Sequence, residues 1–168
     1  MRYAGIMSGE ISARTREFLV RYRRIAMVGV SANPTRASYR ALVHMVSKGY
    51  TIYPVNPGVP EILGLRCYRS LADVGEPVEI VDIFRRGETV PPLVAEARAI
   101  GAKVFWMQIG VVSEEAARAA AAAGMEVVMD RCVKIEHCRF FGKRDYGLDV
   151  VGLNSGVLTA RRFDTVFR

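Results

Sequence analysis

The chain has 168 residues and a net charge of +7, and 51% of its residues are hydrophobic. This size and composition are typical of a single domain with its own apolar core. No apolar stretch approaches the roughly 20 residues that a helix needs to cross a bilayer, and no segment near the N-terminus resembles a secretory signal. We therefore expect a cytoplasmic protein with no membrane partner.

The positive charge is concentrated toward the two ends of the sequence. Residues 1–24 and 131–168 carry a net charge of +4 each, whereas residues 25–130 carry −1. Because the cations form neither a stripe on one helix nor a pattern interleaved with aromatics, they argue against nucleic acid as a partner. Basic ends suit equally well a phosphate-rich ligand, a contact in a homodimer or with another protein, or solubility alone. An interaction module that uses these ends is thus one alternative.

The sequence has three cysteines, Cys67, Cys132 and Cys138. They cannot form a disulfide framework, and their spacing matches no zinc-binding pattern. We expect reduced thiols and no bound metal.

Strands and helices are expected to alternate along the chain. Apolar segments predict strands at residues 25–30, 50–55, 78–84, 104–107 and 126–129. Periodicity and end signals predict helices at residues 8–23, 35–48, 90–100, 114–123 and 130–140. Thr89 and Ser113 precede two of these helices and are expected to cap them with their hydroxyls. Residues 61–68 predict a small hairpin or an irregular excursion.

This alternation predicts an α/β fold with a doubly wound, mainly parallel, five-stranded Rossmann-like sheet and helices on both faces. Residues 16–141 are expected to form that domain. An N-terminal extension (1–15) and a C-terminal extension (142–168) would flank it. In such sheets a ligand binds at the carboxyl ends of the strands, where the strand order reverses.

The first strand leads into the first helix through a loop suited to phosphate. Gly29 breaks the apolar run, Ser31 and Asn33 contribute to a turn, and the helix follows. A helix N-terminus offers unpaired N–H groups and a partial positive charge, so it favours a phosphate or a pyrophosphate.

This loop is not a complete dinucleotide fingerprint. Ser31 occupies the place of the second glycine, and the second strand ends at Asn56 rather than at the carboxylate that would bind a ribose 2′-hydroxyl. A simple NAD site is therefore disfavoured. An NADP-linked oxidoreductase is an alternative, because an arginine can bind the 2′-phosphate.

The carboxyl ends of the five predicted strands gather the candidate site residues into one crevice. They comprise residues 29–38, 56–57, 84–85, 108–110 and 130–132.

Five segments in these regions resemble a known family: VGVSANPTRASYR, YPVNP, VDIFR, WMQIGV and VMDRCVKIEH. They are similar, in order and spacing, to segments of the small coenzyme A (CoA)-binding proteins. Those proteins are single Rossmann-like domains related to the nucleotide-binding domain of succinyl-CoA synthetase. The resemblance runs from about Arg16 to Phe141, and the segment GLNSGVLTARR resembles an extension of longer members.

The resemblance implies that the first loop binds the pyrophosphate of CoA or acyl-CoA. Ser31 and Ser38 would offer hydroxyl and backbone N–H donors, and Arg36 would add a cation. Gly29 and Val30 belong to the same loop. Hydroxyl donors beside a helix N-terminus make a suitable anion site, which explains a serine in place of a glycine.

The resemblance also assigns the other strand ends. Asn56 and Pro57 would border the adenosine. Phe84 and Arg85 would flank the adenine and the 3′-phosphate, since an aromatic face suits a base and a guanidinium suits a phosphate. The pantetheine side would be lined by Gln108 and Gly110.

No catalytic constellation emerges from the sequence, which contains neither a nucleophile triad order nor a pair of acids in a plausible pocket. His44 and His137 lie in no glycine-flanked loop like that of a phosphorylated synthetase histidine. We therefore expect non-catalytic binding of CoA or acyl-CoA, as a sensor, store or redox-linked carrier. One further hypothesis is that Cys132 or Cys138 forms a mixed disulfide with the CoA thiol, because basic neighbours and a helix N-terminus favour a thiolate.

Overall fold

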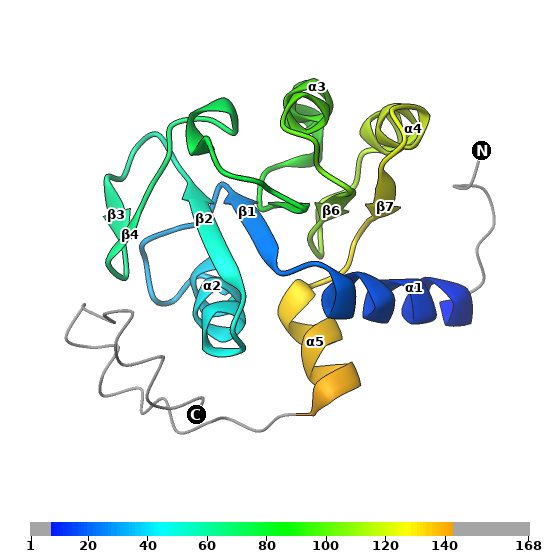
Figure 1. Ribbon diagram of the computed structural model, residues 1–168, viewed down its shortest axis with the longest axis horizontal. Helices are drawn as coiled ribbons and strands as arrows, with labels where there is room; N and C mark the ends of the chain where they lie inside the picture. Colours follow the sequence, from blue (N-terminus) through cyan, green and yellow to red (C-terminus); the bar gives the residue numbers. More distant parts are fainter. Residues whose placement is uncertain (1–7, 143–168) are drawn as a thin grey trace.

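Five parallel strands form the central sheet of the computed structural model, which describes residues 8–142 (Figure 1). The strand order is β2-β1-β5-β6-β7. The strands are β1 (Arg24–Val28), β2 (Thr51–Val55), β5 (Ile80–Ile83), β6 (Val104–Met107) and β7 (Glu126–Val128). The predicted doubly wound parallel fold is confirmed.

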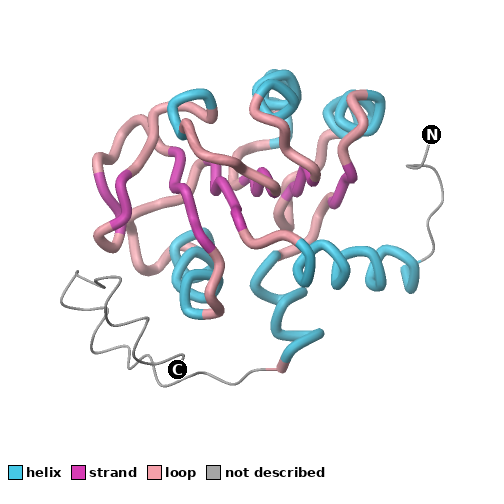
Figure 2. The backbone as a smooth tube through the Cα atoms, in the orientation of Figure 1, coloured by secondary structure: helices cyan, strands magenta, loops and turns pink. Residues whose placement is uncertain are grey.

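Helices cover both faces of this sheet (Figure 2). They are α1 (Ser8–Arg21), α2 (Ala37–Ser47), α3 (Pro91–Ala99), α4 (Glu114–Ala122) and α5 (Val133–Phe141). In Figure 1, α3 and α4 lie above the sheet, and α1, α2 and α5 lie below it. Among residues 8–142, no helix is long and apolar enough to cross a membrane.

Each strand face contributes to a separate apolar core, because side chains alternate along a strand. On β1, Ala26 and Val28 belong to the core between the sheet and helices α3 and α4. Ile25 and Met27 belong to the core between the sheet and helices α1, α2 and α5. All four are at most 1% exposed. Burial on both faces explains why the sequence of β1 is continuously apolar.

A small excursion follows β2, as expected. The strands β3 (Glu61–Ile62) and β4 (Leu65–Arg66) pair as an antiparallel hairpin. A 3-10 turn, η1 (Ala72–Val74), then precedes β5. In Figure 1 the hairpin lies beside β2, at the edge of the sheet.

Two predicted helix starts are wrong and one is confirmed. Thr89 does not cap a helix: it ends the 3-10 turn η2 (Gly87–Thr89), its hydroxyl donates to the Arg86 carbonyl, and α3 begins only at Pro91. The last helix begins at Val133 rather than at 130, because Asp130 adopts a positive φ of 58° that a helix does not allow. Ser113 does cap α4, accepting the backbone N–H of Ala116 at 3.2 Å.

The predicted extensions fall largely outside the described residues. Residues 1–7 and 143–168 are not described, so the roles expected for those segments stay predictions. Helix α1 continues without a break through the expected domain boundary at residues 15 and 16.

Candidate functional site

The reversal of strand order lies between β1 and β5. From β1 the chain passes through α2 to β2 on one side, and it later returns to β5 on the other side of β1. Parallel α/β sheets bind ligands at such a point, outside the carboxyl ends of the strands. We name the region formed by residues 29–38, 56–57, 84–85 and 108–110 the switch-point crevice.

Gly29 lets the two strand ends at this reversal approach each other closely. Its φ is 83°, and a Cβ atom at this position would lie 2.8 Å from the Phe84 carbonyl oxygen and 3.0 Å from Cγ of Arg85. Backbone hydrogen bonds from Gly29 to Val55 and from Phe84 to Val28 hold the strand ends together. Glycine is thus required here for both its conformation and its size.

The loop after Gly29 is ordered by its own side chains. The Ser38 hydroxyl accepts the Ser31 N–H at 3.0 Å, and the Ser31 hydroxyl accepts the Asn33 N–H at 3.1 Å. Both hydroxyl oxygens act as acceptors in these bonds, so each keeps a proton that it can donate to an anion. Arg36 is exposed at the N-cap of α2 and makes no side-chain cap, and the first turn of α2 carries no acidic residue. These features favour an anion at the helix start.

Asn56 connects the end of β2 to the same loop. Its side-chain N–H donates to the Val30 carbonyl at 2.9 Å, and its side-chain oxygen accepts the Gly58 N–H at 2.9 Å. Val30 is buried, whereas Pro57 is exposed beside Asn56. Asn56, which stands where a dinucleotide site has an acid, therefore links the end of β2 to the loop after Gly29.

The end of β5 contributes a partly buried aromatic and a partly exposed cation. Phe84 packs against the core beneath α1, α2 and α5, and Arg85 is half-buried against Gly29. The structure thus brings Phe84 and Arg85 to the same strand end as the Gly29 loop.

Gln108 is directed into the protein rather than toward solvent. The residue is 3% exposed; its side-chain N–H donates to Asp82 at 2.6 Å, and its oxygen accepts the Val133 N–H at 3.3 Å. Both ends of the amide are thus engaged by the chain itself. Gly110, two residues later, is exposed, and its N–H donates to Asp130 at 2.7 Å.

Asp82 is a buried carboxyl that the sequence analysis missed. It is fully buried on β5, and one of its carboxyl oxygens, Oδ2, has no hydrogen-bond partner among the described residues. Burial raises the pKa of Asp82 to about 8, although the hydrogen bond from Gln108 acts in the opposite direction. The sequence signal that could have identified this buried carboxyl is a single acid within the apolar run of β5.

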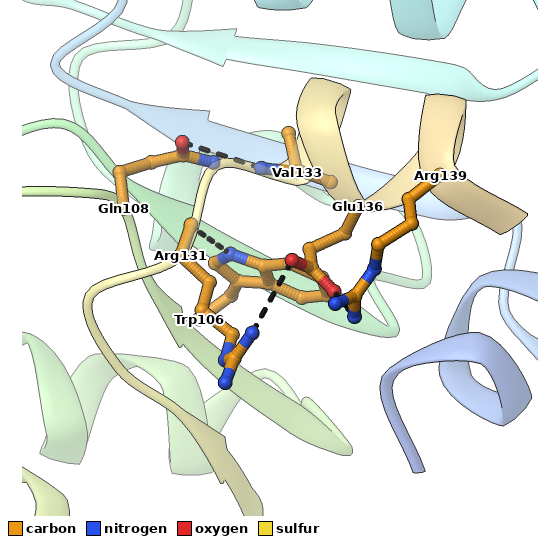
Figure 3. A network of polar contacts seen from close by, with 6 residues as sticks. All are labelled: Trp106, Gln108, Arg131, Val133, Glu136 and Arg139. Carbon is orange, nitrogen blue, oxygen red and sulfur yellow. Dashed lines mark hydrogen bonds and ion pairs between the residues drawn. The ribbon is translucent and has the colours of Figure 1, made fainter. Parts of the chain in front are cut away.

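A polar network fixes the segment between β7 and α5 (Figure 3). The buried Trp106 donates its indole N–H to the Arg131 carbonyl at 2.7 Å. The Arg131 and Arg139 guanidiniums donate to Glu136 at 3.4 and 2.6 Å. Together with the Gln108 contact, these bonds hold Cys132 at the start of α5.

Exposed apolar side chains lie next to Gly110, in the loop after β6. Ile109 and Val112 are 62% and 52% exposed. Sequence reasoning missed them because exposure cannot be read from a short apolar run. They offer an apolar surface at the same sheet edge as the crevice.

A shallow hollow of about 630 Å³ lies elsewhere, between α3 and α4. Small side chains line most of it, and Arg98 is its one cation. Its lining offers little to a diphosphate. Within residues 8–142, no cluster of histidines, cysteines or acids is arranged to hold a metal ion.

A family model described as the CoA binding domain matches residues 23–138, which is most of the chain. The chain belongs to the CoA-binding domain family. This CoA-binding domain is 40% identical over 131 residues to the uncharacterized protein YneT of Bacillus subtilis (strain 168), covering 78% of this chain and 97% of that protein.

The CoA-binding domain is also homologous to part of larger ligases. It is 26% identical to ADP-forming acetate–CoA ligase II of Archaeoglobus fulgidus, over 87% of this chain but only 21% of the ligase. The resemblance inferred from the five sequence segments is therefore confirmed at the level of the family.

Solved structures share the fold. A hypothetical protein from Pyrococcus horikoshii OT3 superimposes with a TM-score of 0.78 at 37% identity, covering 84% of this chain and all of that one. The dinucleotide-forming acetyl-CoA synthetase 1 of Ca. Korarchaeum cryptofilum, in complex with phosphate and ADP, superimposes with a TM-score of 0.60 at 27% identity. The match covers 68% of this chain and 27% of the synthetase.

Proposed function

We propose that this chain binds CoA or acyl-CoA in the switch-point crevice without catalysing a reaction, as a sensor or store. The observation that carries the proposal is the Gly29 loop: a close approach of two strand ends, followed by a helix N-terminus whose first turn carries no acidic residue and whose N-cap makes no side-chain cap. Membership of the CoA-binding domain family supports the identity of the ligand.

In this proposal the first turn of α2 binds the pyrophosphate. The Ser31 and Ser38 hydroxyls donate to phosphate oxygens, because each accepts a backbone N–H in the loop and keeps its own proton to donate. Arg36 is exposed at the same helix end and adds a charge that complements the phosphates.

The nucleoside lies across the reversal of strand order. Asn56 and Pro57 border the ribose on the β2 side, and Phe84 contacts the adenine on the β5 side. Arg85 is partly exposed and binds the 3′-phosphate, which distinguishes CoA from its dephosphorylated form.

The pantetheine arm follows the loop after β6. Gly110 leaves room for the chain, and the exposed Ile109 and Val112 pack against the arm or an acyl group. Gln108 has a supporting role here, since its amide links the end of β6 to Asp82 of β5 and to Val133 at the start of α5.

Calorimetric titration of ligand-stripped protein with CoA, dephospho-CoA and NADP tests this proposal. We expect saturable CoA binding, weakened roughly tenfold in Arg85→Ala and in Ser38→Ala, because each loses a hydrogen bond to a charged group worth about 1.5 kcal/mol. Arg98→Ala, which removes an exposed cation on α3, is the matched control and should bind normally. Tight NADP binding with no CoA signal would overturn the proposal.

A further inference from the structure

A cysteine and both histidines of the chain meet between α2 and α5, away from the first turn of α2. The His44 Nε2 atom lies 3.1 Å from Nδ1 of His137 and 3.7 Å from the Cys138 sulfur. His44 follows Ser38 by six residues in α2, roughly 9 Å along the axis at 1.5 Å per residue. The cluster therefore lies outside the proposed phosphate site.

The two histidines are buried, and the Cys138 residue is partly exposed. His44 and His137 are 7% and 6% exposed, whereas Cys138 is half-buried. The His137 ring packs against the rings of Tyr50 and Phe141, with centroids 5.7 and 4.8 Å away. Of the three residues, Cys138 is therefore the one that solvent reaches most.

His137 is suited to be a neutral hydrogen-bond partner. Burial lowers the pKa of His137 to about 4, and the charges of Lys48 and Arg23 act in the same direction. At neutral pH the His137 ring is therefore uncharged. In the tautomer protonated on Nε2, Nδ1 of His137 accepts a hydrogen bond from His44 once Nε2 of His44 has taken up a proton.

We propose that Cys138 is a thiol that reacts with hydroperoxides, with His44 as its general base and His137 as the acceptor that stabilises the proton taken up by His44. The geometry supports this role because His44 Nε2 is within hydrogen-bond distance of both the sulfur and His137. A proton taken from the thiol would lie on a nitrogen that has two acceptors, the thiolate and Nδ1 of His137.

The reaction balances with the peroxide as oxidant. The sulfur attacks one peroxide oxygen, an S–O bond forms, and the O–O bond breaks. The sulfur is oxidised by two electrons and the peroxide is reduced. The proton that His44 accepted passes to the leaving alkoxide, so the products are a cysteine sulfenic acid and an alcohol, or water when the oxidant is hydrogen peroxide.

The surrounding charge favours an anionic sulfur. Cations face the cluster from several elements: Arg16 of α1 lies over the Phe141 ring, Arg23 precedes β1, and Lys48 follows α2. On α5, Glu136 is the nearby acid among the described residues, and it is already paired with Arg139 and Arg131.

Cys132 provides an internal control for this proposal. It is also half-buried and lies at the N-cap of the same helix, without a side-chain cap hydrogen bond. Both histidines of the chain are in the cluster with Cys138, so Cys132 has no general base of this kind. Cys67 is buried, and burial raises the pKa of its thiol, so it should react slowest.

The test is site-resolved mass spectrometry of the full chain exposed to hydrogen peroxide with a sulfenic-acid trap. We expect Cys138 to be trapped at least about tenfold faster than Cys132, since general-base assistance is worth tenfold or more. In His44→Gln, the Cys138 rate should fall about tenfold while the Cys132 rate and CoA binding stay unchanged.

Equal rates at Cys138 and Cys132 in the unaltered chain would overturn the proposal, whether or not CoA binds. An unchanged rate ratio in a folded His44→Gln variant would also overturn it. If that variant does not fold, the rates in the unaltered chain decide. A thiol with a general base beside it should react faster than Cys132, which has none, and equal rates would contradict the role of His44.

Discussion

The two sides of the switch-point crevice use their polar groups differently. On the β1 and β5 side, Ser31, Arg36 and Arg85 are partly or fully exposed, and the hydroxyls of the loop keep a proton to donate. On the β6 and β7 side, Gln108, Trp106 and Glu136 are buried, and their polar atoms are bonded to neighbouring segments. The first side thus presents its polar groups to solvent, whereas the second uses them to hold neighbouring segments together.

This difference implies two kinds of response to substitution. Changes on the β1 and β5 side should weaken binding, whereas changes on the β6 and β7 side should lower stability first. Gly29 is the exception, because it determines how closely the strand ends approach.

Gly29→Ala should have the largest effect. A side chain there meets the Phe84 carbonyl at 2.8 Å and a φ of 83°, so we expect a loss of about 3 kcal/mol in unfolding free energy and no detectable CoA binding. Gly124→Ala is the matched control: φ is 85° but no atom lies within 4 Å, so only the backbone strain of about 1 kcal/mol should appear. Urea denaturation measures both, and equal losses would contradict the close-approach argument.

Gln108→Leu should lower the unfolding free energy by breaking the contacts that join β5, β6 and α5. It leaves the Val133 N–H and an Asp82 oxygen without their partner in a buried place, which costs about 2 kcal/mol. Gln108→Glu should restore the acceptor for Val133 but place an acid beside Asp82. Denaturation curves that show no loss in Gln108→Leu would mean that the network does not hold α5.

Asp82→Asn should change the pH dependence of stability. Burial raises the pKa of Asp82 from 3.8 to about 8, so the folded chain retains a proton that the unfolded chain releases above pH 4. Its contribution to stability is complete below about pH 4 and is lost as the pH rises toward 8, by up to about 1.4 kcal/mol per pH unit.

Asparagine keeps the oxygen that accepts from Gln108 and has no proton to release. The variant should therefore lose less stability than the unaltered chain between pH 5 and 8, as measured by urea denaturation. Asp73→Asn, at an exposed acid, is the control and should leave the slope unchanged. Parallel pH profiles for Asp82→Asn and the unaltered chain would contradict the assignment of a protonated carboxyl.

Arg36→Ala should have the smallest effect and should act on binding alone. The side chain is exposed and makes no cap, so stability should stay within about 0.5 kcal/mol. The CoA dissociation constant should rise about threefold at low salt, and the difference should shrink as salt screens the charge. A binding loss that is independent of salt would argue against a contact between Arg36 and phosphate.

Periodicity was sufficient for the fold but not for the buried polar contacts. The continuously apolar runs of β1, β5 and β6 predicted a parallel sheet, because strands of this kind are buried on both faces and are typical of parallel sheets covered by helices. The start of α5 was misplaced because Asp130 has a positive φ and accepts a hydrogen bond from Gly110, twenty residues away in sequence, and neither feature can be read from the local pattern. The prediction that Thr89 caps a helix failed for a local reason. Thr89 ends a 3-10 turn, and α3 begins only at Pro91.

The roles of individual polar side chains were harder to infer. The sequence placed Gln108 at a strand end, but its orientation depends on Asp82 of the neighbouring strand and on Val133 of α5. The sequence analysis gave His44 no role, because its contacts with His137 and Cys138 join positions more than 90 residues apart. Such contacts require the packing of two helices and cannot be read from spacing.

Mapping of backbone amide chemical shifts during a CoA titration tests the location of the ligand most directly. The account predicts that the largest shifts occur at Ser31–Ser38 and at Phe84 and Arg85, with smaller shifts near Gly110. Shifts concentrated instead at Ala95, Ala99 and Ala119, which line the hollow between α3 and α4, would contradict it.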